Sequence, residues 1–424
     1  MSGLLTAGAG QHWESELVAR LDEPNAPLTV VRRCADMNEV LAIGATGRAR
    51  AAVLDGSIRR LDTEAVQRLL AAGVAVVGVH PAGDTRGRTR LERLGITALV
   101  ADDEGAPALM EASRRAIAEL ADRPVAPGAA ADPRRALPPP ARPVTPAADP
   151  VRSTGIVVAV WGPTGAPGRS TVAAGLADML SGQGHPTLLI DADVYGGVLA
   201  SAFGVLDESP GLAGACRLAA NGRLDAAGLA GLCWSLSPQL RLLTGIARAD
   251  RWPEVRPTAL GGVLAAARRL APVTIVDCGF AIEADEEISF DTLAPRRNGA
   301  TLTVLDDADR VLVVGSADPP GMERLIRALA ELAEILPSVR PEVVLNRVRS
   351  SSAPADQARA ALRRFAGITS AVELPEDRAG TDAAWIRGVP LSVAAPKSPL
   401  RAALRPLSGS LLAASRAPAG VASR

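Results

Sequence analysis

A stretch rich in proline and alanine, residues 123–154, divides this chain of 424 residues. Proline lacks a backbone hydrogen-bond donor, and the stretch has no apolar repeat that could face a core. It therefore predicts a semi-extended linker with a separately folded unit on each side. We expect one domain over residues 1–122, a second over residues 155–405, and a flexible tail over residues 406–424.

Short apolar runs alternate with amphipathic stretches on both sides of this linker. In the first unit the predicted strands are residues 3–7, 28–34, 50–56, 74–80 and 96–102, and the predicted helices are residues 12–21, 36–47, 61–73 and 85–95. In the second unit the predicted strands are residues 155–161, 186–193, 240–245, 273–279, 310–317 and 342–348, and the predicted helices are residues 170–183, 258–270, 321–336 and 354–365. Strands that alternate with helices pair in parallel and are covered on both faces. We therefore expect an α/β protein with two doubly wound parallel-sheet domains.

The order of elements in the first unit resembles a response-regulator receiver domain. Asp55 ends the third predicted strand, where a receiver carries its phosphate-accepting aspartate. A receiver also needs an acidic pair after its first strand to hold Mg²⁺ and a lysine after its fifth, whereas residues 7–9 read AGA and residues 101–103 read ADD. Without the metal and the cation, a phosphoryl group has no counter-charge. We expect Asp55 to cap a turn and the unit to be a degenerate receiver-like module for docking or dimerisation.

Residues 161–171, WGPTGAPGRST, follow an apolar strand and lead into an amphipathic helix. They have the outline of the phosphate-binding loop G-x-x-x-x-G-K-[ST], with Pro163 at the first glycine and Arg169 at the lysine. Main-chain N–H groups at a helix N-terminus bind phosphate whatever the side chains are. Arg169 can contact phosphate through its planar guanidinium, and the Ser170 hydroxyl can bind Mg²⁺. For the loop taken alone, a plain strand–turn–helix is the alternative.

Three aspartates and one asparagine end other predicted strands of the second unit. Asp191 and Asp193 lie in HPTLLIDAD, Asp277 ends PVTIVD, and Asn346 ends PEVVLN. Ligands of open α/β sheets collect at the carboxyl ends of strands, so we expect these side chains near the loop. Each aspartate alone could be a helix cap, but the ordered set favours a nucleotide site with Mg²⁺. Asn346 could pair with the edge of a purine.

The order of loop, D-A-D, apolar strand ending in D, and LNR resembles the MinD/ParA class of P-loop ATPases. That class has the loop G-K-G-G-x-G-K-[ST], which carries an additional signature lysine. Thr164 and Arg169 stand at the two lysine positions in this chain. The signature lysine normally reaches the nucleotide of a dimer partner, so Thr164 is a departure from the pattern of the class.

The resemblance implies ATP and Mg²⁺ as cofactors. It implies catalytic roles for Asp193, which would orient the attacking water, and for Arg169. Asp277 matches the Walker-B carboxylate, Asp191 the neighbouring switch position, and Asn346 the asparagine that reads adenine. The predicted metal ligands are Ser170, Asp191 and Asp277. The predicted nucleotide contacts are Gly165, Ala166, Pro167, Gly168, Arg169, Ser170, Thr171 and Asn346.

A receiver-like unit joined by a linker to a degenerate MinD/ParA ATPase is similar to the CpaE/TadZ family, which helps to localise the Flp/Tad pilus assembly machine. The loop and residues 290–302, FDTLAPRRNGATL, also resemble an actinobacterial branch described as septum-site-determining. These resemblances imply a homodimeric, ATP-dependent spatial switch, whose partners are a pilus or secretion ATPase or the septum machinery. The alternative is a pseudo-ATPase scaffold that docks partners without hydrolysis, which Thr164 and Arg169 favour.

The composition argues against several other functional classes. The chain has 46 basic and 46 acidic residues and no basic stripe, which argues against specific nucleic-acid binding. Four cysteines without a CxxC pair argue against disulfides, a metal site and an iron–sulfur carrier. The first residues lack the pattern of a signal peptide, so we expect a cytoplasmic protein.

Two further segments have open interpretations. Arg296 and Arg297 could meet nucleotide or a partner, or could form a solvated basic turn. Leucines at helical spacing in residues 398–416 could make a peripheral membrane contact, for instance at a pole or septum. Pro406 and Gly409 interrupt that helix, and we expect a structural role for it.

Overall fold

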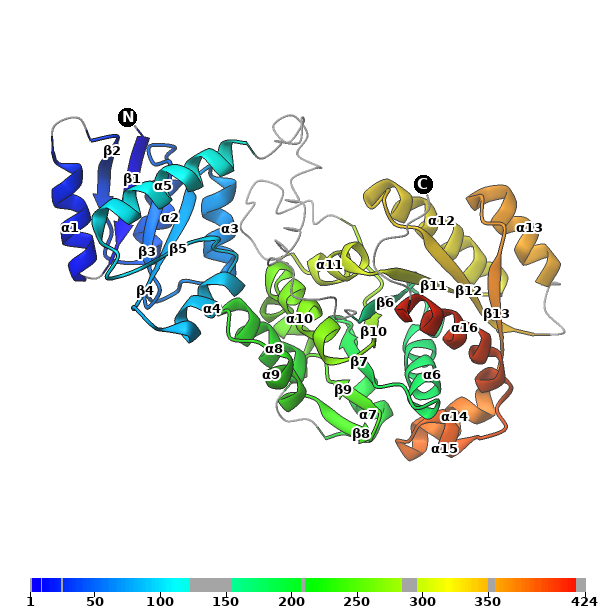
Figure 1. Ribbon diagram of the computed structural model, residues 1–424. Helices are drawn as coiled ribbons and strands as arrows, with labels where there is room; N and C mark the ends of the chain where they lie inside the picture. The colour runs from blue at the N-terminus through cyan, green and yellow to red at the C-terminus, as the bar shows by residue number, and fades with distance from the viewer. Residues whose placement is uncertain are drawn as a thin grey trace. The chain divides into compact units, whose positions relative to one another are not determined.

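The computed structural model describes residues 2–8, 10–23, 26–122, 155–206, 210–283, 296–349 and 355–416, and it divides into two compact units (Figure 1). The first unit is Met1–Thr145 with Leu218–Arg223, and the second is Pro146–Arg217 with Leu224–Arg424. The predicted linker, the end of the predicted tail beyond residue 416, and residues 290–295 of the segment with the actinobacterial resemblance lie outside the described residues.

The sheet of the first unit has five parallel strands in the order β2-β1-β3-β4-β5. The strands are β1 (Ser2–Ala7), β2 (Leu28–Arg33), β3 (Ala51–Asp55), β4 (Ala75–His80) and β5 (Ala98–Ala101). The helices are α1 (His12–Leu21), α2 (Met37–Gly44), α3 (Thr63–Ala71), α4 (Thr85–Arg93) and α5 (Gly105–Ala121). Helices α1 and α5 pack on one face, and α2, α3 and α4 on the other (Figure 1). This is the doubly wound arrangement expected from the sequence, with the strand order of flavodoxin-like folds.

The carboxylate of Asp55, at the end of β3, is engaged within the first unit. Its Oδ1 accepts hydrogen bonds from the main-chain N–H of Ser57 at 2.8 Å and from the Ser57 hydroxyl. Its Oδ2 accepts a hydrogen bond from Nε1 of Trp13 at 3.3 Å. The Trp13 ring is buried, and a Cβ at residue 8 would lie 2.7 Å from it. The ring therefore fills space beside the position where a receiver carries an acidic residue, and Asp55 caps the turn after β3, as expected.

The second unit contains an eight-stranded sheet in the order β13-β12-β11-β6-β10-β7-β9-β8. The strands are β6 (Ile156–Trp161), β7 (Thr187–Ala192), β8 (Trp234–Ser237), β9 (Leu240–Leu243), β10 (Val273–Cys278), β11 (Arg310–Ser316), β12 (Pro341–Val348) and β13 (Ala371–Pro375). Adjacent strands are parallel except β8, which is antiparallel to β9. The sheet is therefore mixed: its other strands are parallel, as expected, and β8 adds an antiparallel strand at one edge. Only residues 238–239 join β8 to β9, and so short a connection joins antiparallel strands.

Helices cover both faces of this second sheet. They are α6 (Arg169–Gly182), α7 (Leu199–Ala202), α8 (Gly211–Ala220), α9 (Ala226–Gly231), α10 (Pro257–Leu270), α11 (Gly299–Asp307), α12 (Pro319–Ile335), α13 (Ala355–Ala366), α14 (Arg378–Arg387), α15 (Leu391–Ala394) and α16 (Pro399–Arg416), with a 3-10 turn at Ala249–Glu254. One face carries α6 and α16, and the other carries α10, α11 and α12 (Figure 1). The predicted loop lies between β6 and α6, at the carboxyl edge of the sheet.

Helix α16 continues through Pro406, whereas the sequence predicts a flexible tail from residue 406. Leu404, Leu407 and Leu411 of this helix are buried in the core of the second unit. Burying a leucine side chain contributes about 1.5–3 kcal/mol, so three of them outweigh the roughly 3 kcal/mol that a proline costs inside a helix. The apolar face of α16 is therefore a structural element, as expected.

Candidate functional site

Neighbouring strands bring the predicted carboxylates to one edge of the second sheet. Strand β10 lies between β6 and β7, and Asp277 on β10 is paired in register with Asp191 on β7 and with Val160 on β6. The two aspartates therefore lie next to each other near the carboxyl ends of their strands, close to the start of the loop that follows β6. This placement at the carboxyl ends of parallel strands is the one that the sequence predicts.

The loop between β6 and α6 has a left-handed backbone at three positions. The dihedral φ is +96° at Gly165, +51° at Ala166 and +100° at Gly168. Gly168 is the N-cap of α6, and it supplies no side-chain acceptor to the N–H groups of the first helical turn. N–H groups at such a terminus can bind an anion together with the positive end of the helix dipole.

Asn346, near the end of β12, is buried against this loop. Its Nδ2 donates a hydrogen bond to the carbonyl of Pro167 at 2.8 Å. A Cβ at residue 168 would overlap Nδ2, so glycine at this position makes room for the amide. The amide therefore holds the loop in place, a role that the sequence did not reveal because it depends on β12 lying beside the loop in space. A contact between Asn346 and adenine stays a prediction.

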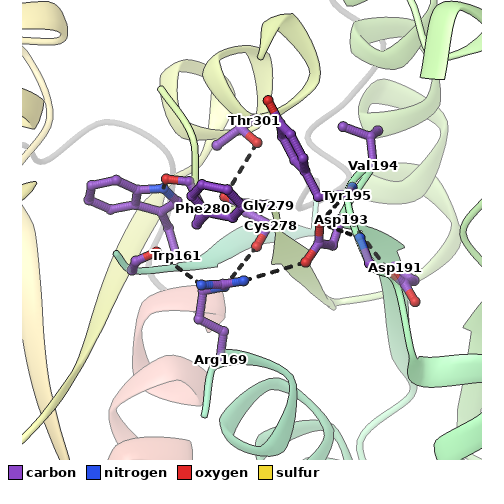
Figure 2. Close-up of polar contacts among 12 residues, drawn as sticks. Trp161, Arg169, Asp191, Asp193, Val194, Tyr195, Cys278, Gly279, Phe280 and Thr301 are labelled. Carbon is purple, nitrogen blue, oxygen red and sulfur yellow. Dashed lines mark hydrogen bonds and ion pairs between the residues drawn. The ribbon is translucent and has the colours of Figure 1, made fainter. Parts of the chain in front are cut away.

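The side chain of Arg169 turns back across the loop, where four acceptors of the protein hold its guanidinium (Figure 2). Nη1 donates hydrogen bonds to the carbonyls of Gly162 at 3.2 Å and Pro163 at 3.0 Å. Nε donates to the carbonyl of Cys278 at 3.1 Å, and Nη2 lies 3.4 Å from Oδ2 of Asp193. The side chain of Arg169 is only 11% exposed. The two predicted catalytic residues therefore form an ion pair with each other.

Asp193 is also tied to the loop that follows β7. Its Oδ1 accepts hydrogen bonds from the main-chain N–H groups of Tyr195 at 2.9 Å and Gly196 at 3.2 Å, while Oδ2 faces Arg169. The carboxylate thus links the loop after β7 to the phosphate loop. Its position beside the guanidinium is compatible with a ligand between the two loops, and its role in orienting water stays a prediction.

Asp191 uses both of its carboxylate oxygens within the protein. Oδ1 accepts a hydrogen bond from the N–H of Asp193 at 3.2 Å, and Oδ2 accepts one from the N–H of Leu199 at 3.0 Å. Burial and, to a lesser extent, the nearby charge of Asp193 raise the pKa of Asp191 to about 6, although these hydrogen bonds oppose the rise. Asp191 therefore shapes the loop after β7, and direct metal ligation by it stays a prediction.

Asp277 is the most unusual carboxylate of the site. It is 0% exposed, and neither of its oxygens has a hydrogen-bond partner among the described residues. Burial raises its pKa well above the usual value, and the charge of Asp191 acts in the same direction. The Ser170 hydroxyl and the Arg169 guanidinium lie near enough to oppose this rise, although the hydroxyl is not in hydrogen-bond geometry with either oxygen.

A buried carboxylate without partners costs free energy unless a cation or a proton satisfies it. Asp277 beside the Ser170 hydroxyl offers the hard oxygen donors that Mg²⁺ prefers, and Mg²⁺ usually takes only one or two protein ligands and completes its shell with water and phosphate oxygens. The residues present therefore fit Mg²⁺. Within the described residues, no group of three or more His, Cys, Asp or Glu side chains is placed to hold a metal ion by itself.

Aromatic and basic side chains also contact one another near this edge of the sheet, and the sequence did not predict these contacts. The Tyr195 hydroxyl donates a hydrogen bond to Oδ1 of Asn298, and the Arg297 guanidinium carbon lies 3.9 Å from the centroid of the Tyr195 ring. The Tyr195 ring also contacts the Phe280 ring, with centroids 4.9 Å apart (Figure 2). These contacts join the loops after β7 and β10 to the start of α11. Arg297 therefore packs on an aromatic ring instead of forming a solvated turn.

Other predicted contact residues are placed differently. Ala166 is exposed at the tip of the loop, as is Thr164. Thr171 lines a small cavity of about 30 Å³ with residues of α7 and α14, including Ala202 and Trp385. Thr171 therefore borders a pocket on the side of α6 that faces α7 and α14.

The four cysteines are free, and burial raises the thiol pKa of Cys34, Cys216 and Cys233 to about 12. In the part of the chain that the structure describes, no helix has the length and apolar character needed to span a bilayer.

A strand, a left-handed loop, an uncapped helix terminus and strand-end carboxylates together define a nucleotide-binding α/β domain of the P-loop class. Residues 158–384 match the family model described as the CobQ/CobB/MinD/ParA nucleotide binding domain. This match spans more than half of the 424 residues, and the chain therefore belongs to that family.

Several solved structures are similar to this chain. The second unit is similar to a ParA family ATPase from Chlorobium tepidum TLS, with 22% identity, a TM-score of 0.52, and 61% of this chain aligned with 98% of that chain. Two MinD proteins are also similar: the cell division ATPase of Pyrococcus furiosus (17% identity, TM-score 0.48, 61% and 98% covered) and the septum site-determining protein of Pyrococcus horikoshii OT3 in complex with Mg-ADP (15%, 0.48, 63% and 100%). The first likeness supports the fold. A comparison with curated proteins gave no match.

Proposed function

We propose that the second unit binds ATP with Mg²⁺ and that nucleotide binding switches the protein between two states that position a partner in the cell. The observation that carries this proposal is the buried, unpartnered carboxylate of Asp277 near Ser170, which belongs to the first turn of a helix with no side-chain cap at its N-terminus. An anion above that terminus and a divalent cation beside Asp277 would satisfy both features at once.

The roles of the chain's own residues follow from their places. Main-chain N–H groups from Gly165 to the first turn of α6 would hold the phosphates, and Ser170 and Asp277 would hold Mg²⁺. Bound Mg²⁺ would neutralise charge on the phosphate oxygens. Arg169 and Asp193 would be the residues that respond to nucleotide, because each currently satisfies the other.

A phosphate near Arg169 would compete with Asp193 for the guanidinium. Guanidinium groups bind phosphate as a planar fork, so this exchange is chemically favourable. Asp193 released from Arg169 could then orient a water molecule, and the loop after β7 would move with it, because that loop is bonded to Asp193 through Tyr195 and Gly196. A change in this loop is the kind of order–disorder switch by which nucleotides control partner surfaces.

We further propose the CpaE/TadZ-like role implied by the sequence: a homodimer that positions a Flp/Tad pilus or secretion assembly, or a septum site, as a cytoplasmic protein recruited to a pole, a septum or the membrane surface. The receiver-like first unit would serve as a docking or dimerising module, because the carboxylate of Asp55 is already engaged by Ser57 and Trp13. The proposed partners are a pilus or secretion ATPase or septum proteins.

A second candidate is a pseudo-ATPase scaffold that docks partners without hydrolysis. The observation that favours it is the guanidinium of Arg169, which is satisfied by four acceptors of the protein itself. Binding and turnover measured on the same variants separate the two candidates.

The test of the proposed function is titration calorimetry of the full chain with ATP and ADP, in Mg²⁺ and in EDTA. Ser170→Ala and Asp277→Asn should lose the part of the affinity that depends on Mg²⁺, whereas Asp250→Asn, which changes an exposed carboxylate paired with Arg248, should bind as the wild type does. If the protein hydrolyses ATP through Asp193, the rate of phosphate release should be lower in an Asp193→Ala variant than in the wild type. Binding without such turnover favours a switch without hydrolysis, and absence of all binding by a folded protein leaves only the scaffold.

A further inference from the structure

A second pocket borders the phosphate loop on the side of helix α12. It has a volume of about 110 Å³ and lies between the exposed first half of the loop, at Thr164 and Gly165, and the turn from β11 into α12. Ser316, Asp318 and Arg324 line it from that turn and helix. None of these three residues belongs to the motifs that the sequence analysis selected.

The guanidinium of Arg324 lies directly on the loop. A Cβ at residue 165 would overlap Nη1 of Arg324, so the absence of a side chain at Gly165 lets the guanidinium reach the loop backbone. Gly165 also has φ of +96°, a conformation that other residues rarely adopt. The positive φ therefore favours glycine here, and the lack of a Cβ also leaves room for the guanidinium of Arg324.

Among the described residues, Arg324 makes no hydrogen bond and no ion pair. Its neighbour Arg327, on the same helix, is paired with Glu323 at 2.7 Å. Arg169, on the other side of the loop, has four acceptors. Arg324 thus places a positive charge and N–H donors that have no protein acceptor among the described residues against a phosphate loop.

The carboxylate of Asp318 lines the same pocket but forms no ion pair with Arg324. Its Oδ1 accepts a hydrogen bond from the N–H of Gly321 at 2.9 Å as the N-cap of α12, and its Oδ2 accepts one from the Ser316 hydroxyl. These hydrogen bonds, that from Ser316 first, lower the pKa of Asp318 and keep it ionised. Its charge is therefore directed at a helix terminus, which favours a negative group.

We propose that Arg324 is a phosphate-binding residue, which contacts the terminal phosphate of a nucleoside triphosphate bound on the loop. It would supply from α12, within the same chain, a positive charge that Thr164 does not supply from the loop. This inference rests on the proposed function, because it needs a nucleotide on the loop between Arg169 and Arg324. It adds a residue that distinguishes a triphosphate from a diphosphate.

The experiment compares the affinities of ATP and ADP, with Mg²⁺, for full-length Arg324→Ala and for the matched control Arg327→Ala. A hydrogen bond to a charged group supports a loss of about tenfold in ATP affinity for Arg324→Ala. ADP affinity should change by less than about twofold, because the terminal phosphate is absent. Arg327→Ala should leave both affinities unchanged. Thermal unfolding checks that each variant is folded.

A double variant sharpens the test. A lysine at residue 164 would reach the nucleotide of a dimer partner, so Thr164→Lys should restore ATP affinity to Arg324→Ala only where the double variant dimerises. Unchanged ATP affinity in Arg324→Ala, or an equal loss for ATP and ADP, would overturn the inference. If either result is found while the wild type binds ATP and Ser170→Ala weakens that binding, the role of Arg324 is refuted and the proposed function stands. A folded wild type that binds no nucleotide refutes the proposed function itself.

Discussion

Replacing Asp277 with asparagine should stabilise the nucleotide-free protein and at the same time abolish Mg²⁺-dependent nucleotide binding. Asp277 is 0% exposed and has no hydrogen-bond partner among the described residues, so its charge is uncompensated when no cation is present. Leaving a buried polar group unsatisfied costs about 1–3 kcal/mol, and more for a charged group. Asparagine keeps the shape of the side chain and removes the charge. We expect the free energy of unfolding to rise by about 1–3 kcal/mol at pH 7.

The pH dependence of this gain has a definite sign. The pKa of Asp277 is raised in the folded state, so its contribution to stability is fully present below the unfolded pKa of about 3.9 and is lost as the pH rises toward the folded pKa. One pKa unit corresponds to about 1.4 kcal/mol, so the largest loss available at pH 7 is about 4 kcal/mol. The stability difference between Asp277→Asn and the wild type should therefore be small near pH 4 and should grow toward pH 7.

Calorimetric unfolding of both proteins in EDTA at pH 5 and at pH 7 measures this difference. A gain of 1–3 kcal/mol corresponds to a rise in melting temperature of about 2–10 °C for a domain of this size. Addition of Mg²⁺ and ATP should then stabilise the wild type and leave Asp277→Asn unchanged. A variant that is no more stable than the wild type at pH 7, or that keeps its Mg²⁺-dependent binding, would refute the reasoning that Asp277 is an uncompensated carboxylate awaiting a cation.

Three further changes test separate parts of the structure. Asp193→Asn should free Arg169 from its ion pair, so that nucleotide binds at least as tightly by calorimetry while phosphate release falls; weaker binding would contradict the competition. Leu404→Ala, at a site that is 0% exposed, should lower the free energy of unfolding by about 2–5 kcal/mol in urea titrations, and a loss below about 1 kcal/mol would contradict the core role of α16. Incubation with acetyl phosphate should add no phosphoryl group to Asp55 by intact mass spectrometry, because its carboxylate is already hydrogen-bonded; a stable adduct there would count against the degenerate receiver.

Apolar patterning predicted the buried strands of both sheets, because a strand covered on both faces consists almost entirely of apolar residues. It missed β13, which reads AVELP, since an edge strand of a sheet is short and only partly buried. It also missed β8, which is exposed along most of its length. The helix α16 was cut short at Pro406, because sequence alone does not show how much apolar surface lies beneath a helix. These three differences lie at the edges of a sheet and in a helix whose packing cannot be seen in the sequence.

Some features of the candidate site could be predicted from the sequence and others could not. The position of Asp277 next to Asp191 followed from the order of the strands, since both residues end apolar runs and strand ends collect at one edge. The contact between Asn346 and Pro167, and the approach of Arg324 to Gly165, join residues more than 150 positions apart in the chain and have no local signature. Only the spatial order of β12, β11 and β6 brings them together.

Arg169 stands where the phosphate-loop motif has a lysine. The two side chains carry the same charge, so the difference lies in the hydrogen bonds that each can make in the nucleotide-free state. A lysine has three N–H donors on a single nitrogen, whereas a guanidinium has five donors in a planar fork. Only the fork can reach the carbonyls of Gly162, Pro163 and Cys278 together with the carboxylate of Asp193 in the observed arrangement. Arg169 therefore stabilises the loop without nucleotide, and a phosphate gains affinity only by the difference between its own contacts and those that it displaces. That difference sets how strongly nucleotide biases the two states, which makes residue 169 the place where this chain departs furthest from an ordinary phosphate loop.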